Sequence, residues 1–205
     1  MKILELFAGS RSFSKNAEKI GGYDVFTSDI EPFEKIDYVT NILDFDVNVV
    51  PFKPDIIWAS PPCTGFSVAA IGYHWDGGKN AYKPKTETAK LGIEIVKKTI
   101  EIINHFKPKY WYIENPRGVL RKLDFMQELH RKTVTYCQYG DNRMKPTDIW
   151  TNNIAWNPKP MCKNGDLCHE PAPRGSRTGT QGRKNAYERS KVPDELCTEI
   201  ILNSK

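Results

Sequence analysis

We expect an α/β fold built on a Rossmann-like sheet that is mostly parallel and doubly wound. Two observations predict it. Short apolar runs of strand length alternate with amphipathic helical patterns along residues 1–156, which is typical of a sheet covered by helices on both faces. Polar or reactive residues follow directly after several of these runs, at the predicted carboxyl ends of strands, where open α/β folds bind ligands. The 205 residues are enough for one such domain with a substantial core.

Six apolar runs account for the predicted strands, and they cover residues 2–7, 23–28, 54–59, 109–113, 133–138 and 148–151. The clearest helix covers residues 86–106, because its apolar side chains recur at helical spacing and Pro108 ends it. The side chains expected on its apolar face are Leu91, Ile95, Ile102 and Phe106, widened by Ile93, Val96, Ile100 and Ile103. Residues 193–202 predict a terminal helix with Pro193 at its start.

Positive charge is concentrated in one segment. Residues 157–191 contain eight Lys or Arg and three acids, a net charge of +5 that equals the net charge of the whole chain. The segment is also rich in Pro, Gly, Ser and Thr, so no regular element is expected over residues 157–188. A flexible basic stretch is suited to contact with a phosphate backbone, and a solvated loop is the alternative interpretation.

Composition narrows the class of protein. The chain has no charged-then-apolar leader and no apolar run long enough to cross a membrane, so we expect a soluble cytoplasmic protein. Five irregularly spaced cysteines argue against a disulfide framework. The absence of G-x-x-x-x-G-K-[ST] argues against a P-loop nucleotide hydrolase.

The most informative segment is the tetrapeptide Ser60-Pro61-Pro62-Cys63, directly after the third predicted strand. Two prolines form a stiff spacer that carries the thiol of Cys63 beyond the strand. Glu114 and Asn115 follow the fourth predicted strand in the same way. Because the carboxyl ends of parallel strands meet at one edge of a sheet, we expect the thiol and the acid to lie on the same rim. The pair suggests covalent catalysis with a proton donor or acceptor beside the nucleophile.

Two further turns suggest a nucleotide-like cofactor. Gly9 lies in the turn after the first predicted strand, where backbone can approach a ligand near a helix N-terminus. The second predicted strand ends at Asp29 and Ile30, an acid that can bind ribose hydroxyls and an apolar side chain that can pack on adenine. A helix cap or a surface acid is the alternative for Asp29.

Together these segments resemble the DNA (cytosine-5)-methyltransferase family, over about residues 3–151 and 189–202. The resemblance lies in five blocks in the family's order, at residues 6–10 (the S-adenosylmethionine loop), 60–67 (the nucleophile), 114–115 (the acid), 139–150 (contact with the target base) and 189–193 (return to the cofactor pocket). It implies a methyltransferase version of the predicted fold. The implied organisation is a catalytic domain (1–156), a short basic loop in place of a recognition domain (157–188) and a returning C-terminal segment (189–205).

The resemblance implies a reaction with DNA and S-adenosylmethionine. The Cys63 thiolate would add to C6 of a cytosine flipped out of the duplex, and C5 would then accept the methyl group. Glu114 would act at N3, which requires a carboxyl whose pKa is raised by burial, and Asn115 would orient that acid or the cytosine amino group. The implied catalytic set is Cys63, Glu114, Asn115, Pro62 and Lys145, and the implied cofactor set is Phe7, Ala8, Gly9, Ser10, Asp29, Ile30, Asn41, Ile42, Pro61 and Ser190.

Four positions depart from the family pattern. Arg11 stands where the cofactor loop often has a second glycine, and Asn41 stands where an aspartate is common. Lys145 and Thr147 stand where two arginines are usual. Lysine cannot reproduce a bidentate guanidinium contact, so the resemblance leaves contact with the target base open to rearrangement.

The short recognition region leaves several alternatives open. Specificity would come from the loop of residues 157–188 or from a partner protein. Cys162, Cys168 and His169 could bind zinc together with Cys197 or Cys137, but C-x5-C-H is poor ligand spacing, so we expect free cysteines and no metal site. RNA or a free cytosine nucleotide is an alternative substrate, and a catalytically silent nucleic-acid-binding protein is an alternative function. Such compactness is similar to that of phage members; the sequence does not indicate a recognition site or an oligomeric state.

Overall fold

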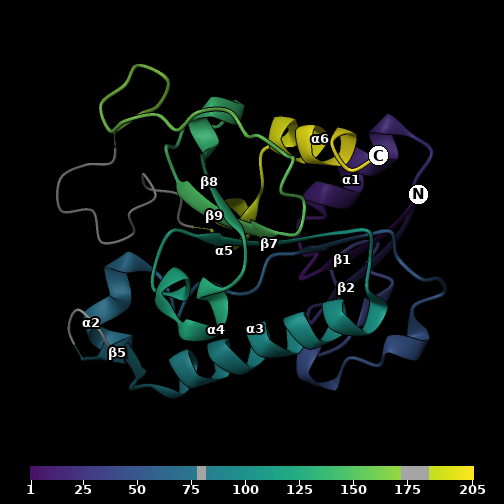
Figure 1. Ribbon diagram of the computed structural model, residues 1–205, viewed down its shortest axis with the longest axis horizontal. Coiled ribbons are helices and arrows are strands. Elements are labelled where there is room, and N and C mark those ends of the chain that lie inside the picture. The colour runs from purple at the N-terminus through teal and green to yellow at the C-terminus, as the bar shows by residue number, and fades with distance from the viewer. Residues whose placement is uncertain (78–81, 172–184) are drawn as a thin grey trace.

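A seven-stranded sheet organises the computed structural model, which describes residues 1–77, 82–171 and 185–205 (Figure 1). Its strands are β1 (Lys2–Leu6), β2 (Asp24–Asp29), β3 (Tyr38–Val39), β4 (Ile56–Ala59), β7 (Tyr110–Pro116), β8 (Arg131–Thr135) and β9 (Pro146–Thr151). They lie in the order β3-β2-β1-β4-β7-β9-β8. The first five in this order are parallel, whereas β9 is antiparallel to both of its neighbours. The mostly parallel α/β fold predicted from the sequence is confirmed.

The order of the strands reverses between β1 and β4. The chain builds outward from β1 through β2 to β3 and then returns to place β4 on the other side of β1. Ligands of doubly wound sheets bind at such a switch point, beyond the carboxyl ends of the strands. The turn after β1 and the segment after β4 therefore lie at the position where this fold binds ligands.

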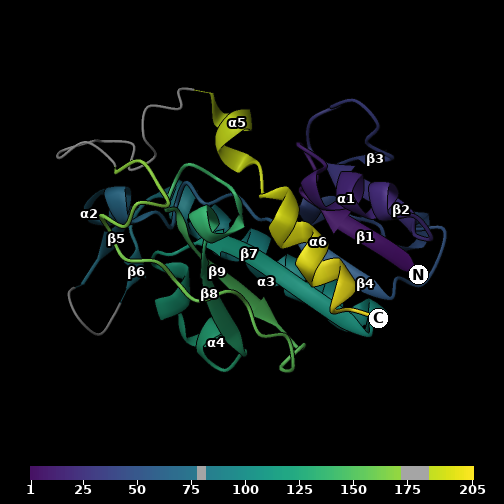
Figure 2. The same cartoon turned by 90° about the horizontal axis from the view of Figure 1, so that it is seen from above.

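Helices cover both faces of the sheet (Figure 1). On one face lie α1 (Ser12–Ile20) and α6 (Asp194–Leu202), which pack against each other, and on the other lie α3 (Glu87–Phe106) and α4 (Asp124–Gln127). Figure 2 shows α6 alongside α1 from above, with both termini at the same end of the molecule. The remaining elements are η1 (Ile42–Asp44), η2 (Val47–Val49), η3 (Val68–Ala70), α2 (Ile71–His74), β5 (Trp75–Asp76), β6 (Lys83–Pro84), η4 (Leu120–Lys122), η5 (Tyr136–Tyr139) and α5 (Ala186–Ser190).

Strand alternation divides the apolar residues between two cores. In β4, Ile57 belongs to the cluster beneath α3, whereas the next residue, Trp58, belongs to the cluster beneath α1 and α6. Both side chains are almost completely buried. Successive side chains point to opposite faces of a strand, so a strand covered on both faces is apolar throughout. This is why residues 56–59 are a continuous apolar run.

The structure corrects two details of the sequence prediction. Leu91 is 46% exposed, and the buried stripe of α3 instead contains Ala89, Gly92, Val96, Thr99, Ile102, Ile103 and Phe106. The apolar stripe is broad enough to allow either rotation of the helix, and packing decides between them. Residues 136–138, expected in a strand, belong to the 3-10 helix η5, and the two-residue edge strand β3 was not predicted.

The basic segment is described in part. Basic residues at 174, 177, 183 and 184 lie outside the described residues. Within the part of the chain that the structure describes, no helix is both long and apolar enough to cross a membrane.

Candidate active site

The predicted nucleophile and acid leave one edge of the sheet from adjacent strands. β4 and β7 pair in parallel, with Ala59 opposite Ile113. Glu114 follows Ile113 within β7 and is only 5% exposed, and Cys63 follows Ala59 by four residues and is half-buried. The register of these two strands therefore brings the Ser60–Cys63 segment and Glu114 to the same rim, as the sequence predicts.

Asn115 ties this rim together. Its side chain is completely buried, and its Nδ2 donates a hydrogen bond of 2.9 Å to the carbonyl oxygen of Pro61. Its Oδ1 is buried and accepts no hydrogen bond from the described residues. The contact gives Asn115 a positioning role for the proline spacer, and the unpaired oxygen is an acceptor that a ligand can use.

A second link joins the segments that follow the two strands. Gly118 forms a bridge with Ser67, and the Val119 amide donates to the carbonyl oxygen of Phe66 at 2.8 Å. A Cβ atom added at Gly118 would lie 2.1 Å from that oxygen. Only glycine allows this close approach of two backbones, which holds the segment after Cys63 against the segment after Glu114.

Glu114 has two polar neighbours. The hydroxyl of Tyr136 donates a 2.8 Å hydrogen bond to Glu114 Oε1, and Lys145 Nζ lies 4.0 Å from the same oxygen. Burial, followed by the charge of Glu114, raises the pKa of Tyr136 well above its usual value. Tyr136 therefore stays a donor and is a site residue that sequence reasoning missed. Tyr136 directly follows β8, and this position at the end of a strand could have indicated it as a site residue.

Lys145 lies inside the site. Its side chain is 10% exposed, and burial lowers its pKa, whereas the neighbouring Glu114 raises it. Its Nζ lies 4.4 Å above the Tyr136 ring and donates to the carbonyl oxygen of Arg189 at 3.2 Å. Lys145 thus connects the acid with the C-terminal segment, although it stands where the family usually has arginine.

Burial disfavours the thiolate form of Cys63. Burial raises the pKa of the Cys63 thiol, Lys145 lowers it and Glu114 raises it. A protonated thiol is a weak nucleophile, so the reaction requires an arrangement that favours the anion. Lys145 is the cation that lowers the Cys63 pKa most, followed by Arg189.

The turn after β1 has the backbone geometry of a ligand loop. Phe7 and Arg11 both adopt left-handed backbone conformations, with φ of 59° and 52°, on either side of Gly9. The Gly9 amide donates to Asp29 Oδ2 at 2.8 Å. Arg11 therefore has the left-handed conformation that glycine favours, although it carries a side chain. Strained residues of this kind concentrate at ligand sites.

The second wall of this turn fits a nucleoside. The side chain of Ile30 is 61% exposed beside Asp29, as expected for an apolar surface that an aromatic base covers. Asp29 accepts hydrogen bonds from the Gly9 and Glu31 amides, and a carboxylate has lone pairs left for hydroxyl groups. The acid and the apolar side chain predicted from the sequence therefore lie together at the switch point of the sheet.

Other predicted cofactor residues are placed less directly. Asn41 Oδ1 accepts a hydrogen bond from the Leu43 amide and caps η1. The side chain of Ile42 is buried in the core, so any cofactor contact would involve its backbone. Ser190 is exposed at the end of α5 and its hydroxyl donates to the Tyr187 carbonyl.

The rest of the predicted set follows the two loops. The Ala8 amide donates to the Ser28 carbonyl at 3.0 Å, and the hydroxyls of Ser10 and Ser12 lie 2.8 Å apart. Pro61 is buried, whereas Pro62 is exposed. These residues hold the two loops in place at the edge of the sheet.

Glu5 is a second buried acid that the sequence reasoning did not identify. It is 3% exposed, and its oxygens accept hydrogen bonds from the Phe13 and Ser14 amides at the start of α1. Burial raises its pKa to about 7, against the opposing effect of these hydrogen bonds. The carboxyl anchors α1 to β1 beneath the cofactor turn.

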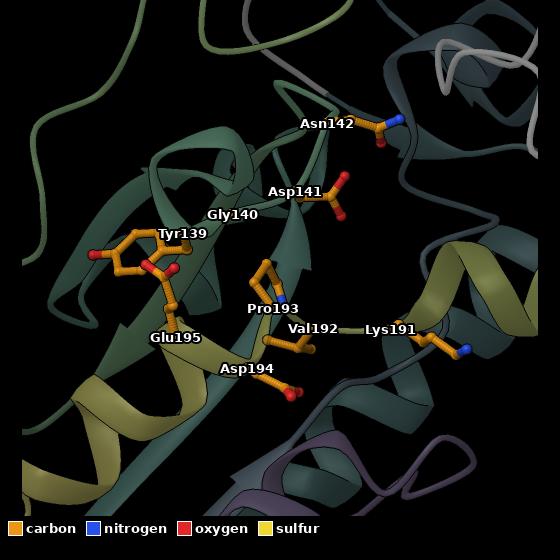
Figure 3. Close-up of a pocket in the computed structure, with 9 residues that line it drawn as sticks. All are labelled: Tyr139, Gly140, Asp141, Asn142, Lys191, Val192, Pro193, Asp194 and Glu195. Atoms are coloured by element: carbon orange, nitrogen blue, oxygen red, sulfur yellow. The ribbon is translucent and has the colours of Figure 1, made fainter.

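A cavity of about 520 Å³ opens where the C-terminal segment meets the sheet (Figure 3). One wall consists of residues 139–142, at and after the end of η5, and the other consists of residues 191–195, before and at the start of α6. Figure 3 labels three carboxylates around it, Asp141, Asp194 and Glu195. Residues 139–142 and 191–193 of this lining belong to the two blocks that the resemblance assigns to contact with the target base and to the return to the cofactor pocket. The individual residues predicted for catalysis and cofactor binding are not among those that line it.

Comparisons of the sequence with known proteins give matches to DNA methyltransferases. The family model for C-5 cytosine-specific DNA methylase matches residues 1–133. A relative from Frog virus 3 (isolate Goorha), named "Probable DNA (cytosine-5)-methyltransferase", is 29% identical over 98% of this chain and 99% of its own length. The type II methyltransferase M.HpaII of Haemophilus parainfluenzae is 26% identical over 57% of this chain and 31% of its own length.

A solved structure resembles the fold. It is described as a "putative DNA modification methyltransferase" encoded within an E. coli prophage, and it superposes with a TM-score of 0.52 at 13% identity. The match covers 84% of this chain and 52% of that chain, so this chain spans about half the length of the solved relative. At this identity the likeness supports the fold alone.

Proposed function

The chain belongs to the C-5 cytosine-specific DNA methylase family, and from that premise we propose that it methylates C5 of cytosine in DNA through a covalent bond between Cys63 and C6. The methyl donor in this proposal is S-adenosylmethionine. The observation that carries the proposal is the shared rim. Cys63 and Glu114 leave adjacent parallel strands, and Asn115 holds the spacer between β4 and Cys63 at 2.9 Å.

Three residues perform the proposed chemistry. The thiolate of Cys63 adds to C6 of the cytosine, the electrons of the C5–C6 double bond move onto C5 and make it nucleophilic, and Glu114 shares or donates a proton at N3. After C5 has gained its methyl group, a base removes the C5 proton and the electrons of that bond expel the thiolate. Lys145 favours the thiolate, because its positive charge lowers the pKa of Cys63.

The cofactor residues form the adjoining pocket. Asp29 would bind the ribose hydroxyls of S-adenosylmethionine, Ile30 would cover its adenine, and the turn at Gly9 would approach it through backbone. When bound, this cofactor supplies the methyl group on a sulfonium centre. The exposed face of Ile30 and the strained turn between Phe7 and Arg11 support this assignment.

The proposed organisation divides the chain into three parts with different roles. In the proposed organisation residues 1–156 form the catalytic domain, residues 157–188 contact DNA and residues 189–205 complete the domain. The contacts of α6 with α1 and of Arg189 with Lys145 support the last part. A loop this short leaves base specificity either to its own basic side chains or to a partner protein.

Transfer of labelled methyl tests the reaction. Wild-type protein would be incubated with labelled S-adenosylmethionine and duplex DNA, single-stranded DNA, tRNA or dCMP. We expect 5-methylcytosine in DNA, with complete loss in Cys63→Ala while cofactor binding by calorimetry is retained. Label on tRNA or dCMP alone would mean that the same reaction acts on RNA or on a free nucleotide instead of DNA. Cofactor binding without label on any substrate would indicate a missing recognition partner, whereas the absence of both label and cofactor binding would contradict the proposed reaction.

A second experiment tests the covalent step by itself. DNA with 5-fluorocytosine at the target cannot lose a proton from C5, so the Cys63–C6 bond should persist. We expect a protein–DNA adduct that survives denaturing electrophoresis with the wild type and is missing with Cys63→Ala. Methylation without any such adduct would contradict the covalent mechanism.

A further inference from the structure

Three cysteines and a histidine meet at η5, and one of them precedes the other three by 25 residues or more in the sequence. The cluster consists of Cys137, Cys162, Cys168 and His169. One ligand atom from each lies within 4.8 Å of all the others. Cys137 belongs to η5, and the other three belong to the beginning of the basic segment. We call these four residues the Cys/His cluster.

The distances are close to those of a tetrahedral zinc site. Zinc bonds of about 2.3 Å to sulfur and about 2.0 Å to nitrogen place neighbouring ligand atoms about 3.5–3.8 Å apart. In the structure, His169 Nδ1 lies 3.6 Å from Cys168 Sγ and 3.8 Å from Cys162 Sγ. The sulfurs of Cys137 and Cys162 are 2.9 Å apart, so this one edge must open for a cation to enter.

Burial favours a closed site with one exposed ligand. Cys137, Cys162 and His169 are each less than a tenth exposed, and Cys168 is at the surface. The Nε2 atom of His169 is buried and makes no hydrogen bond with the described residues. The ring is therefore held in this structure by its two sulfur contacts, an arrangement that a bound cation would account for.

We propose that the Cys/His cluster binds one Zn²⁺ ion as a structural site with three thiolates and one imidazole. Cysteine and histidine are the ligands that zinc prefers in structural sites, and four protein ligands leave no open position for catalysis. Binding would release the three thiol protons as the zinc–sulfur bonds form. The Gln138 amide, 3.7 Å from Cys168 Sγ, would donate to that thiolate.

This proposal replaces the expectation of free cysteines at three positions, Cys137, Cys162 and Cys168. The irregular spacing of residues 162–169 indicates no site by itself, because the fourth ligand comes from an element 25 residues earlier. Cys197, the other ligand considered from the sequence, is a buried residue of α6 and is not in the cluster.

The site would join the basic segment to the catalytic rim. The Cys162 amide donates to Thr135 Oγ1 at 3.0 Å, and Cys137 directly follows Tyr136, the residue that contacts Glu114. Zinc would therefore hold the start of the basic segment on the same short helix that positions the acid. Only this link to catalysis rests on the proposed function; the metal site does not.

Metal analysis of the purified full chain tests the proposal. We expect one zinc per chain by plasma mass spectrometry after dialysis without chelator. In Cys168→Ser we expect zinc affinity, measured by competition with a chromogenic chelator, to fall by more than about 100-fold. Cys63→Ala is the matched control, because it removes a cysteine outside the cluster and should keep the zinc. Replacement by Co²⁺ should give the absorption bands of tetrahedral thiolate coordination.

Two outcomes would overturn the proposal. One is a folded protein without zinc affinity and with five reactive thiols. The other is a bond between Cys137 and Cys162, seen as three reactive thiols and a mass lower by two hydrogens. Cys168 is exposed, so its serine variant should fold even if Cys162→Ser does not. Neither readout depends on methyl transfer, so failure of the proposed function would leave this test intact.

Discussion

The catalytic rim and the Cys/His cluster are adjacent through η5, where Tyr136 contacts Glu114 and the next residue, Cys137, belongs to the cluster. The two regions are nevertheless held by different kinds of contact. At the rim, Cys63 and Glu114 are placed by the backbone ladder between β4 and β7 and by the close approach of Gly118 to Phe66. At the cluster, no strand holds residues 162–169, and the described hydrogen bonds that attach this stretch to the domain are few, such as that from Cys162 to Thr135. Backbone pairing fixes positions whatever the side chains are, whereas the second region depends on individual side chains.

Gly118→Ala should break the rim with the largest effect on stability. Its new Cβ would lie 2.1 Å from the Phe66 carbonyl oxygen, which also accepts the Val119 amide. We expect the free energy of unfolding to fall by about 3 kcal/mol, since a backbone must move to relieve the clash. Urea denaturation would measure it.

Gly72→Ala is the matched control, because a Cβ there would meet no atom within 4 Å. Its stability should change little. Equal losses in the two variants would mean that the contact between Gly118 and Phe66 is not tight.

Glu5 should make the stability of the folded protein depend on pH. Burial raises its folded-state pKa from 4.5 to about 7, so between these values the folded protein binds the proton more tightly than the unfolded chain does. The free energy of unfolding should therefore decrease as pH rises from about 4.5 to about 7, by up to about 3 kcal/mol. Glu5→Gln should remove this dependence. Denaturation curves across this range would test it, and equal slopes in both proteins would contradict the assignment.

Tyr136→Phe tests the contact between the two regions. Loss of the hydroxyl removes the hydrogen bond to Glu114, so we expect kcat for methyl transfer to fall about tenfold, with KM values unchanged. Tyr139→Phe is the control in the same helix, because its hydroxyl contacts Glu199 instead. A similar loss of kcat in both variants would mean that η5 matters only for stability.

Arg11→Gly should have the smallest effect. Glycine adopts the left-handed conformation of this residue without the cost of about 1 kcal/mol that a side chain adds, but the ion pair with Glu18 is lost. We expect the free energy of unfolding to change by less than about 1 kcal/mol and the affinity for S-adenosylmethionine to stay the same. A large loss of affinity, measured by calorimetry, would show that the guanidinium group itself binds the cofactor.

The sequence by itself determined that the sheet is mostly parallel and doubly wound, that Cys63 and Glu114 share a rim, and that the turn at Gly9 lies beside Asp29. These follow from local patterns. An apolar run of strand length marks a buried strand, and parallel strands present their carboxyl ends at one edge, so residues just after such runs come together.

Only the tertiary structure decided which face of α3 is buried, that Tyr136 contacts Glu114, and that Cys137 joins Cys162, Cys168 and His169. The physical reason is that these depend on packing between elements. A broad apolar stripe permits more than one rotation of a helix. The contact between Cys137 and Cys162 spans 25 residues and leaves no periodic pattern in the sequence. It depends on where β9 and the loops between these two residues bring the chain.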